Sequence, residues 1–190
     1  MLQRRSVIAT LMANRPKDLF VVPGLGSTTY DMASLGEKDQ DFYLWGAMGG
    51  AAMIGLGLAL AKPSVKVAVI TGDGEMLMGM GSLATIGVQR PANLAIVVFD
   101  NQHYGETGMQ PSHTDSGVDL VGVARACGIR QTLEVQDQAS LETLAGLLGS
   151  FRETLFARVR IAADEPTRVL PSKDGVELKL RFRRAVAAAG

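Results

Sequence analysis

The sequence predicts a single three-layer α/β domain, with a mostly parallel sheet of about six strands and helices on both faces. Two short apolar runs, residues 65–71 and 94–99, are rich in valine and isoleucine, which is typical of strands buried on both faces. A segment of helix length separates them, so we expect a right-handed crossover between parallel strands. The 190 residues suffice for one such domain and are too few for two ordinary ones.

The other elements follow from apolar spacing and from glycine and proline residues. Helices are expected over residues 6–14, 46–61, 79–89, 118–127 and 139–150. Further strands are expected over residues 19–22, 41–45, 132–135 and 155–161, and a polar loop over residues 27–40. We treat residues 1–190 as one domain, with residues 171–190 as a C-terminal helical tail.

Composition excludes several classes of protein. Hydrophobic residues make up 47% and charged residues 20%, and the formal net charge is zero, so neither nucleic acid nor a membrane is expected as a partner. The single cysteine, Cys127, rules out an internal disulfide framework and fits a reducing compartment. The first residues have too short an apolar stretch for a signal peptide. We therefore expect a cytoplasmic protein.

Polar residues follow each of the two apolar strands. Gly72, Asp73 and Gly74 follow the first, and Asp100 and Asn101 follow the second. Parallel strands end at one edge of the sheet, where glycine turns and helix N-termini bind phosphate groups. A carboxylate between two such glycines would repel a phosphate unless a cation such as Mg²⁺ links the two. The sequence therefore predicts a metal–diphosphate site.

This arrangement resembles the motif of the thiamine diphosphate-dependent enzymes. The motif has a GDG, a spacer and a pair of asparagines, and here 25 residues separate Gly74 from Asp100-Asn101, which a YG pair (Tyr104, Gly105) follows. The resemblance implies thiamine diphosphate and Mg as cofactors, with Mg²⁺ held by the side chains of Asp73 and Asn101 and by the backbone carbonyl of His103. Asp100 stands where the family has its first asparagine, which is not a ligand. A Rossmann dinucleotide turn is the alternative, but Leu77 stands in place of its third glycine and Asp73 would be unexplained.

By the same resemblance, the carbonyl of Gly46 would accept a hydrogen bond from the coenzyme's aminopyrimidine, and Met48 would be the wedge that bends the coenzyme. The full set of predicted coenzyme contacts is Gly46, Met48, Gly49, Gly72, Asp73, Gly74, Glu75, Asn101, Tyr104, Gly105, Glu106 and Thr107. The polar loop over residues 106–115 also offers Gln110 and His113 as catalytic candidates that face the substrate. For His113, simple exposure to solvent is the competing interpretation.

Three stretches, GAMGGAAMIGLGLAL, GDGEMLMGMGSLATI and DNQHYGETGMQ, resemble the diphosphate-binding part of the sulfopyruvate and phosphonopyruvate decarboxylases. This resemblance implies a carboxy-lyase subunit that acts on a small 2-oxo acid with a second anionic group. It also implies a separate pyrimidine-binding (α-type) subunit that supplies the catalytic glutamate, and a homodimer of this chain. Two alternatives remain: a subunit of a carboligase similar to acetohydroxyacid synthase, and a non-catalytic chain that binds thiamine diphosphate.

Overall fold

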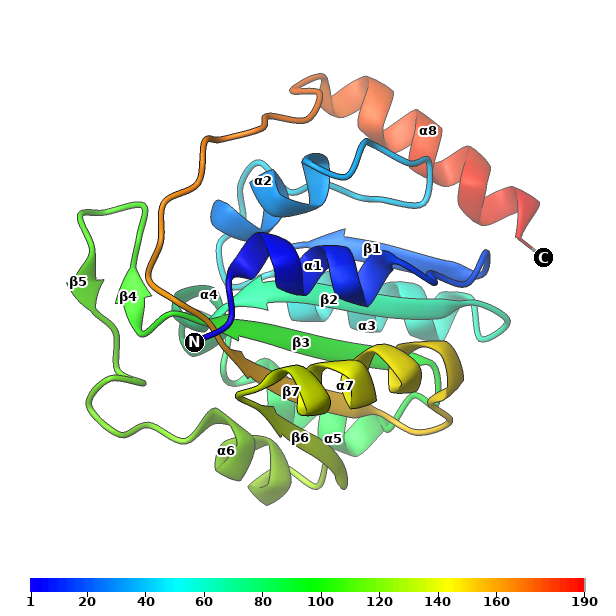
Figure 1. The fold of residues 1–190 in the computed structure, drawn as a ribbon. Coiled ribbons are helices and arrows are strands. Elements are labelled where there is room, and N and C mark those ends of the chain that lie inside the picture. The colour runs from blue at the N-terminus through cyan, green and yellow to red at the C-terminus, as the bar shows by residue number, and fades with distance from the viewer. Residues whose placement is uncertain (190) are drawn as a thin grey trace.

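The computed structural model describes residues 1–189 and consists of three layers, with a parallel sheet between two sets of helices (Figure 1). The five strands lie in the order β1-β2-β3-β7-β6. Their bounds are β1 (Leu19–Pro23), β2 (Lys66–Gly72), β3 (Leu94–Asp100), β6 (Gln131–Val135) and β7 (Leu155–Arg160). β2 and β3 are central, so the polar residues that follow them are attached to strands with a neighbour on each side.

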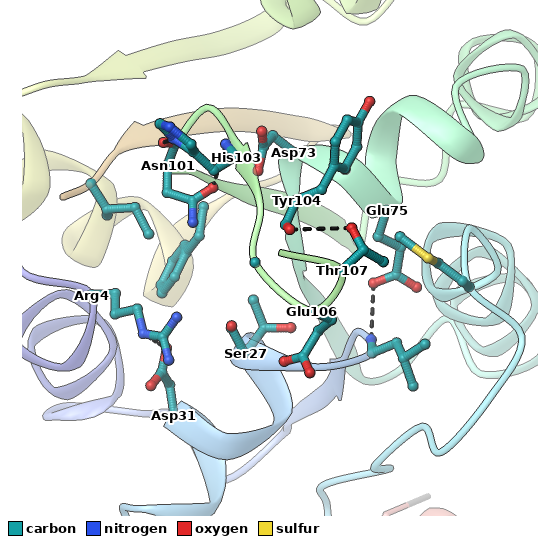
Figure 2. Close-up of a pocket in the computed structure, with 18 residues that line it drawn as sticks. Arg4, Ser27, Asp31, Asp73, Glu75, Asn101, His103, Tyr104, Glu106 and Thr107 are labelled. Carbon is teal, nitrogen blue, oxygen red and sulfur yellow. Dashed lines mark hydrogen bonds and ion pairs between the residues drawn. The ribbon is translucent and has the colours of Figure 1, made fainter. Parts of the chain in front are cut away.

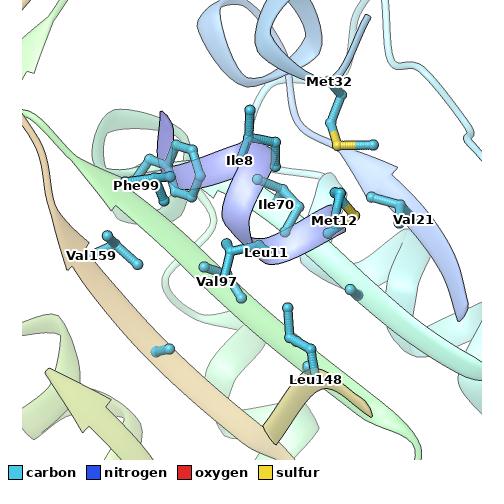
Figure 3. Close-up of a cluster of buried hydrophobic side chains, with 14 of the residues drawn as sticks. Ile8, Leu11, Met12, Val21, Met32, Ile70, Val97, Phe99, Leu148 and Val159 are labelled. Carbon is cyan, nitrogen blue, oxygen red and sulfur yellow. The ribbon is translucent and has the colours of Figure 1, made fainter. Parts of the chain in front are cut away.

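The two faces of the sheet are covered by different helices. α1 (Arg4–Met12), α2 (Ser27–Ala33) and α7 (Gln138–Ser150) cover one face, and α3 (Ala51–Ala61), α4 (Asp73–Met78), α5 (Ser82–Gln89) and α6 (Leu120–Ala126) cover the other. Successive strand residues point to opposite faces: Ile70 and Val97 pack beneath α1 (Figure 3), whereas Val69 and Ile96 pack on the α3 side. Both faces are therefore apolar, which explains the continuous apolar runs in the sequence.

The predicted α/β class is confirmed, but the sheet has five strands and not six. Residues 41–45 contribute only an isolated bridge between Asp41 and Val21 at the edge of β1. The Asp41 carboxylate is buried and accepts a hydrogen bond from Nη1 of Arg15 at 2.5 Å, so this segment is held by an ion pair. The chain then leaves the sheet in the direction of α3.

One loop prediction and one helix prediction also need correction. Residues 27–40 do not form only a polar loop, because they begin with α2, in which Tyr30, Asp31 and Met32 are all buried. The helix expected over residues 79–89 is α5, which begins only at Ser82 after a break at residues 79–81. A separate helix that was not predicted, α4, precedes the break and begins at Asp73 itself. The glycines Gly79 and Gly81 at this break account for the interruption.

The last part of the chain crosses the carboxyl edge of the sheet and then forms a helix. Residues 162–174 run from the end of β7 past α2 to α8 (Gly175–Ala188), in orange and red in Figure 1. Asp174 caps α8 by accepting hydrogen bonds from the N–H groups of Val176 and Glu177. The helix of the predicted tail is thus present, while residue 190 lies outside the described residues. None of the helices described is both long and apolar enough to cross a lipid bilayer.

Candidate functional site

Polar residues from several loops surround a cavity at the carboxyl edge of the sheet (Figure 2). The loops after β1, β2 and β3 form its walls. In the view of Figure 2, Asp73, Asn101 and His103 lie on one side, and Arg4, Ser27 and Asp31 lie on the other. Of the predicted coenzyme contacts, the lining includes Met48, Gly72, Asp73, Gly74, Glu75, Asn101, Tyr104, Gly105, Glu106 and Thr107.

Asp73 is the first residue of α4 and is only 3% exposed. Its Oδ2 accepts a hydrogen bond from Oγ of Ser112 at 2.5 Å and a longer one from Oγ1 of Thr114 at 3.3 Å. Burial raises the pKa of Asp73 to about 6, although the Ser112 hydroxyl lowers it. A buried carboxylate that lacks a neighbouring cation and lines a cavity has the properties of a metal ligand.

Asn101 and His103 are held by a tight turn after β3. Oδ1 of Asn101 accepts a hydrogen bond from the backbone N–H of His103 at 2.9 Å, and Nδ1 of His103 lies 2.8 Å from the Asn101 carbonyl. Gln102 between them has a φ of 63°, in the left-handed region. The turn brings both residues back to the cavity, where the sequence predicted them.

Asp100 belongs to a buried ion cluster next to this turn. Its Oδ2 accepts hydrogen bonds from Nε of Arg158 at 2.6 Å and from Nη1 of Arg160 at 3.2 Å, and its Oδ1 accepts one from Thr114 at 2.8 Å. The carboxylate is fully buried, and its charge is balanced by the two arginines. Sequence reasoning missed Arg158, Arg160, Ser112 and Thr114; the only available signal was the spacing of two arginines at i and i+2 on one strand.

Tyr104 separates the cavity from a second, mostly apolar hollow. Its ring lies against Gly74, where an added Cβ would be 2.8 Å from Cδ1 of the ring. On the far side, its hydroxyl lies 2.6 Å from Nδ1 of His113. His113 therefore lines the second hollow, together with Met48, Leu77 and Met78, and does not line the cavity.

Gln110 lies outside both hollows. It is part of β5 (Gln110–Pro111), which pairs with β4 (His103–Tyr104) in a small hairpin. Its side-chain amide donates to the carbonyl of Thr107 at 2.9 Å and accepts from the Thr107 hydroxyl at 3.0 Å. The roles of Gln110 and His113 toward a substrate stay predictions.

The loop that precedes α3 brings Met48 to the cavity. Met48 is 45% exposed and lines both the cavity and the second hollow, whereas Gly46 and Gly49 line neither. Gly49 has a φ of 86° and packs against Gly79, where a Cβ would lie 2.2 Å from the Gly49 carbonyl oxygen. Two glycines are thus required where this loop touches the junction of α4 and α5.

Charged residues from distant segments complete the cavity. Nε of Arg4 lies 3.2 Å from Oδ2 of Asp31, and both side chains are buried. Glu106 pairs at the surface with Arg168 of the segment that leads to α8, at 3.3 Å. Arg4, Ser27, Thr28 and Asp31 were not predicted as site residues, because nothing in their sequence pattern links them to the edge of the sheet.

Comparison with known proteins identifies the family. A sequence profile described as "Thiamine pyrophosphate enzyme, C-terminal TPP binding domain" matches residues 24–154. The chain belongs to the thiamine pyrophosphate enzyme family. The matched region contains most of the cavity lining, including Asp73, Asn101 and Tyr104.

Two relatives are informative about this thiamine pyrophosphate enzyme chain. It is 34% identical over 190 residues to the β subunit of sulfopyruvate decarboxylase from Methanocaldococcus jannaschii, with 97% of each chain covered. It is 40% identical over 166 residues to phosphonopyruvate decarboxylase from Streptomyces viridochromogenes, with 87% of this chain covered but only 38% of that protein. The solved structure of benzoylformate decarboxylase from Polynucleobacter necessarius shares the fold, with a TM-score of 0.72 and 22% identity over 87% of this chain and 34% of that one.

The oxygen ligands that the cavity offers are suited to Mg²⁺ bound together with a diphosphate group. Among residues 1–189, no group of three histidine, cysteine, aspartate or glutamate side chains is placed to hold a metal ion. Asp73 and Asn101 line the cavity and could each give a cation one oxygen, and phosphate oxygens and water would fill its remaining positions. Mg²⁺ is commonly bound in this way.

Proposed function

We propose that this chain is the diphosphate-binding subunit of a Mg²⁺-dependent, non-oxidative 2-oxo acid decarboxylase. The observation that carries the proposal is the meeting of Asp73 and Asn101 in one cavity, at the ends of the two central strands. Similarity to the sulfopyruvate and phosphonopyruvate decarboxylases supports a substrate of the same class, a 2-oxo acid with a second anionic group.

The proposal gives the residues that line the cavity three roles. Asp73, Asn101 and the carbonyl of His103 would hold Mg²⁺, and Gly72 and Gly74 would let the diphosphate approach the backbone. Met48 and Tyr104 would orient the coenzyme rings. When bound, thiamine diphosphate supplies the electron sink that a 2-oxo acid needs in order to lose CO₂. The protein supplies orientation and electrostatics.

The proposal includes a pyrimidine-binding partner, because the two glutamates that line the cavity in the described chain, and Glu37 as well, already have other partners. Glu75 is engaged by Leu25 and Thr71, Glu106 pairs with Arg168, and Glu37 pairs with Arg181. Exposed apolar side chains in the cavity wall and on α3 and α4 favour an interface with another protein there; these are Met48, Met53 and Met78. A homodimer of this chain is compatible with the same surface.

Reconstitution tests the proposal. The purified chain, thiamine diphosphate and Mg²⁺ are assayed for CO₂ release from sulfopyruvate, phosphonopyruvate and pyruvate, with and without a candidate pyrimidine-binding subunit. We expect release only from the mixture, and faster release from the two dianionic acids than from pyruvate. Full turnover by this chain alone would refute the need for a partner.

The same assay separates the alternative functions. Equal rates with pyruvate and the dianionic acids would contradict the substrate proposal. Formation of a new carbon–carbon bond, detected as an acyloin-type product, would indicate a carboligase. Coenzyme binding without any product, in the presence of the partner, would indicate a non-catalytic chain.

A further inference from the structure

Glu75 lies where several loops of the cavity meet. It belongs to the first turn of α4, and the residue is 4% exposed. Its Oε2 accepts a hydrogen bond from the backbone N–H of Leu25 at 3.0 Å and another from Oγ1 of Thr71 at 2.8 Å. In Figure 2, the carboxylate extends away from Asp73 and Asn101 and toward the loop after β1. The carboxylate therefore joins α4 to that loop.

Met48, on the loop that precedes α3, lines the same cavity as Glu75. Burial raises the pKa of Glu75, while the hydroxyl of Thr71 and the N–H group of Leu25 lower it. In the described part of the chain, Oε1 is buried and has no hydrogen-bond partner. The carboxylate is therefore held through Oε2, by Leu25 and Thr71.

The lack of a side chain at Gly24 leaves room for this carboxylate. A Cβ at Gly24 would lie 1.8 Å from Oε2 of Glu75, so no larger residue fits while Glu75 is in place. The carbonyl of Gly24 accepts hydrogen bonds from the hydroxyls of Thr28 at 3.0 Å and Thr29 at 2.7 Å. The start of α2 is therefore tied to the point where Glu75 is anchored.

We propose that Glu75 is a positioning residue of the coenzyme site, which fixes the loop after β1 relative to the turn at residues 72–74. Leu25, which lines the cavity, lies on this loop. The carboxylate thus sets the distance between two walls of the cavity through its hydrogen bonds with Leu25 and Thr71. The inference rests on the proposed function, because the coenzyme is what the walls enclose.

Amide hydrogen exchange without coenzyme tests the positioning directly. In Glu75→Ala, exchange in peptides covering residues 20–32 should accelerate by about ten-fold or more, as expected when hydrogen bonds to a charged group are lost. Glu75→Gln keeps one oxygen for Leu25 and Thr71, so exchange in these peptides should accelerate less. Residues 138–150 of α7, and the exposed variant Glu142→Gln, serve as controls.

Calorimetry then links the loop after β1 to the coenzyme. Glu75→Ala should weaken binding of thiamine diphosphate with Mg²⁺ by about ten-fold or more, and Glu75→Gln should weaken it less. Unchanged exchange in residues 20–32 would overturn the proposal, and so would weaker binding without faster exchange, because Glu75 would then be a direct contact. Failure of the wild-type chain to bind the coenzyme would count against the proposed function alone, since exchange is measured without it.

A double-mutant cycle covers the case in which Glu75→Ala folds poorly. Gly24→Ala should disrupt the wild-type protein, because its Cβ meets the carboxylate, and residues 20–32 should exchange faster. In the Glu75→Ala background the same methyl group enters the vacated space, so its effect should shrink or reverse in sign. Equal effects of Gly24→Ala in both backgrounds would overturn the coupling between the two residues.

Discussion

The buried carboxylate of Asp100 lies 2.6 Å from Nε of Arg158, and this pair connects the end of β3 to β7 beside the cavity. Arg160 adds a second contact at 3.2 Å, and Thr114 connects Asp100 to Asp73. The charge that replaces the usual asparagine of the motif is therefore balanced by two arginines on the neighbouring strand.

Asp100→Asn should consequently reduce stability. The substitution leaves two mostly buried guanidinium groups without their carboxylate, and breaking such a pair on one side typically costs about 3 kcal/mol. Urea unfolding of the chain should show this loss, while Asp115→Asn, an exposed change in the same region, should cost almost nothing. A stability of Asp100→Asn equal to that of wild type would mean that the arginines find other partners.

Asp73 should determine metal and coenzyme binding. Asp73→Ala removes the only carboxylate proposed as a metal ligand, so calorimetry should detect no binding of thiamine diphosphate with Mg²⁺ at concentrations that saturate wild type. Thermal melting in the same buffer shows whether the variant is folded. Wild-type affinity in a folded Asp73→Ala protein would place the metal elsewhere.

The pH dependence of stability follows from the raised pKa of Asp73. Burial raises this pKa from 3.8 to about 6, so the folded chain binds the proton more tightly than the unfolded chain. Without metal, the resulting stabilisation is complete below about pH 4 and is lost as the pH rises through 6, with a slope of at most about 1.4 kcal/mol per pH unit. Asp73→Asn should lack this contribution when unfolding is measured from pH 4 to 7.5.

Magnesium binding should have the opposite pH dependence, because the ion requires the ionised carboxylate. Affinity for Mg²⁺ with thiamine diphosphate should therefore rise as the pH increases through about 6. Calorimetric titrations at pH 5, 6 and 7.5 check this. An affinity independent of pH over that range would contradict the assignment of Asp73 as the ligand.

Gly74→Ala should displace Tyr104 from the wall of the cavity. The added Cβ would lie 2.8 Å from Cδ1 of the ring, and real carbon atoms do not approach so closely. We expect weaker coenzyme binding, by about ten-fold, for about 1.4 kcal/mol of lost contacts. Gly146→Ala in α7 is the control, because a Cβ there meets nothing within 4 Å and alanine favours a helix.

His113 and Gln110 differ in their surroundings, and substitution should separate them. If His113 faces the substrate across the second hollow, His113→Ala should lower the turnover of the dianionic acid in the reconstituted enzyme. Tyr104→Phe removes the hydroxyl that holds His113 and should reproduce part of the loss. Gln110→Ala should be near neutral, since the Gln110 side chain is bonded to Thr107 within its own loop. A larger effect at Gln110 than at His113 would reverse this interpretation.

The sequence was sufficient to predict the α/β class and to identify the two strands that bear Asp73 and Asn101. Apolar runs reveal buried parallel strands, and parallel strands must end at one edge, so local pattern and topology determined that half of the site. α2 was missed because STTYDMA is buried without an apolar stripe. Its burial depends on Arg4 and Arg5, which pair with Asp31 from another part of the chain.

The remaining site residues were beyond prediction for a related reason. Ser112 and Thr114 contact Asp73 across about 40 positions, and Arg158 reaches Asp100 across 58. Polar contacts over such separations leave no periodic signal in the sequence. The strand predicted over residues 41–45 was wrong for a similar reason. The segment makes a single bridge with β1, at Asp41, and the hydrogen bond from Arg15 to Asp41 fixes it there.

The strand order has a consequence for how the pocket comes apart. Asp73 and Asn101 follow β2 and β3, each of which has two neighbours, whereas Leu25 and Ser27 follow β1 at the edge of the sheet. Edge elements open at a lower free energy than central ones. Under mild denaturant, the wall that carries Leu25 should therefore fray first and release a bound ligand, while the two central strands still hold the remaining half of the pocket in register.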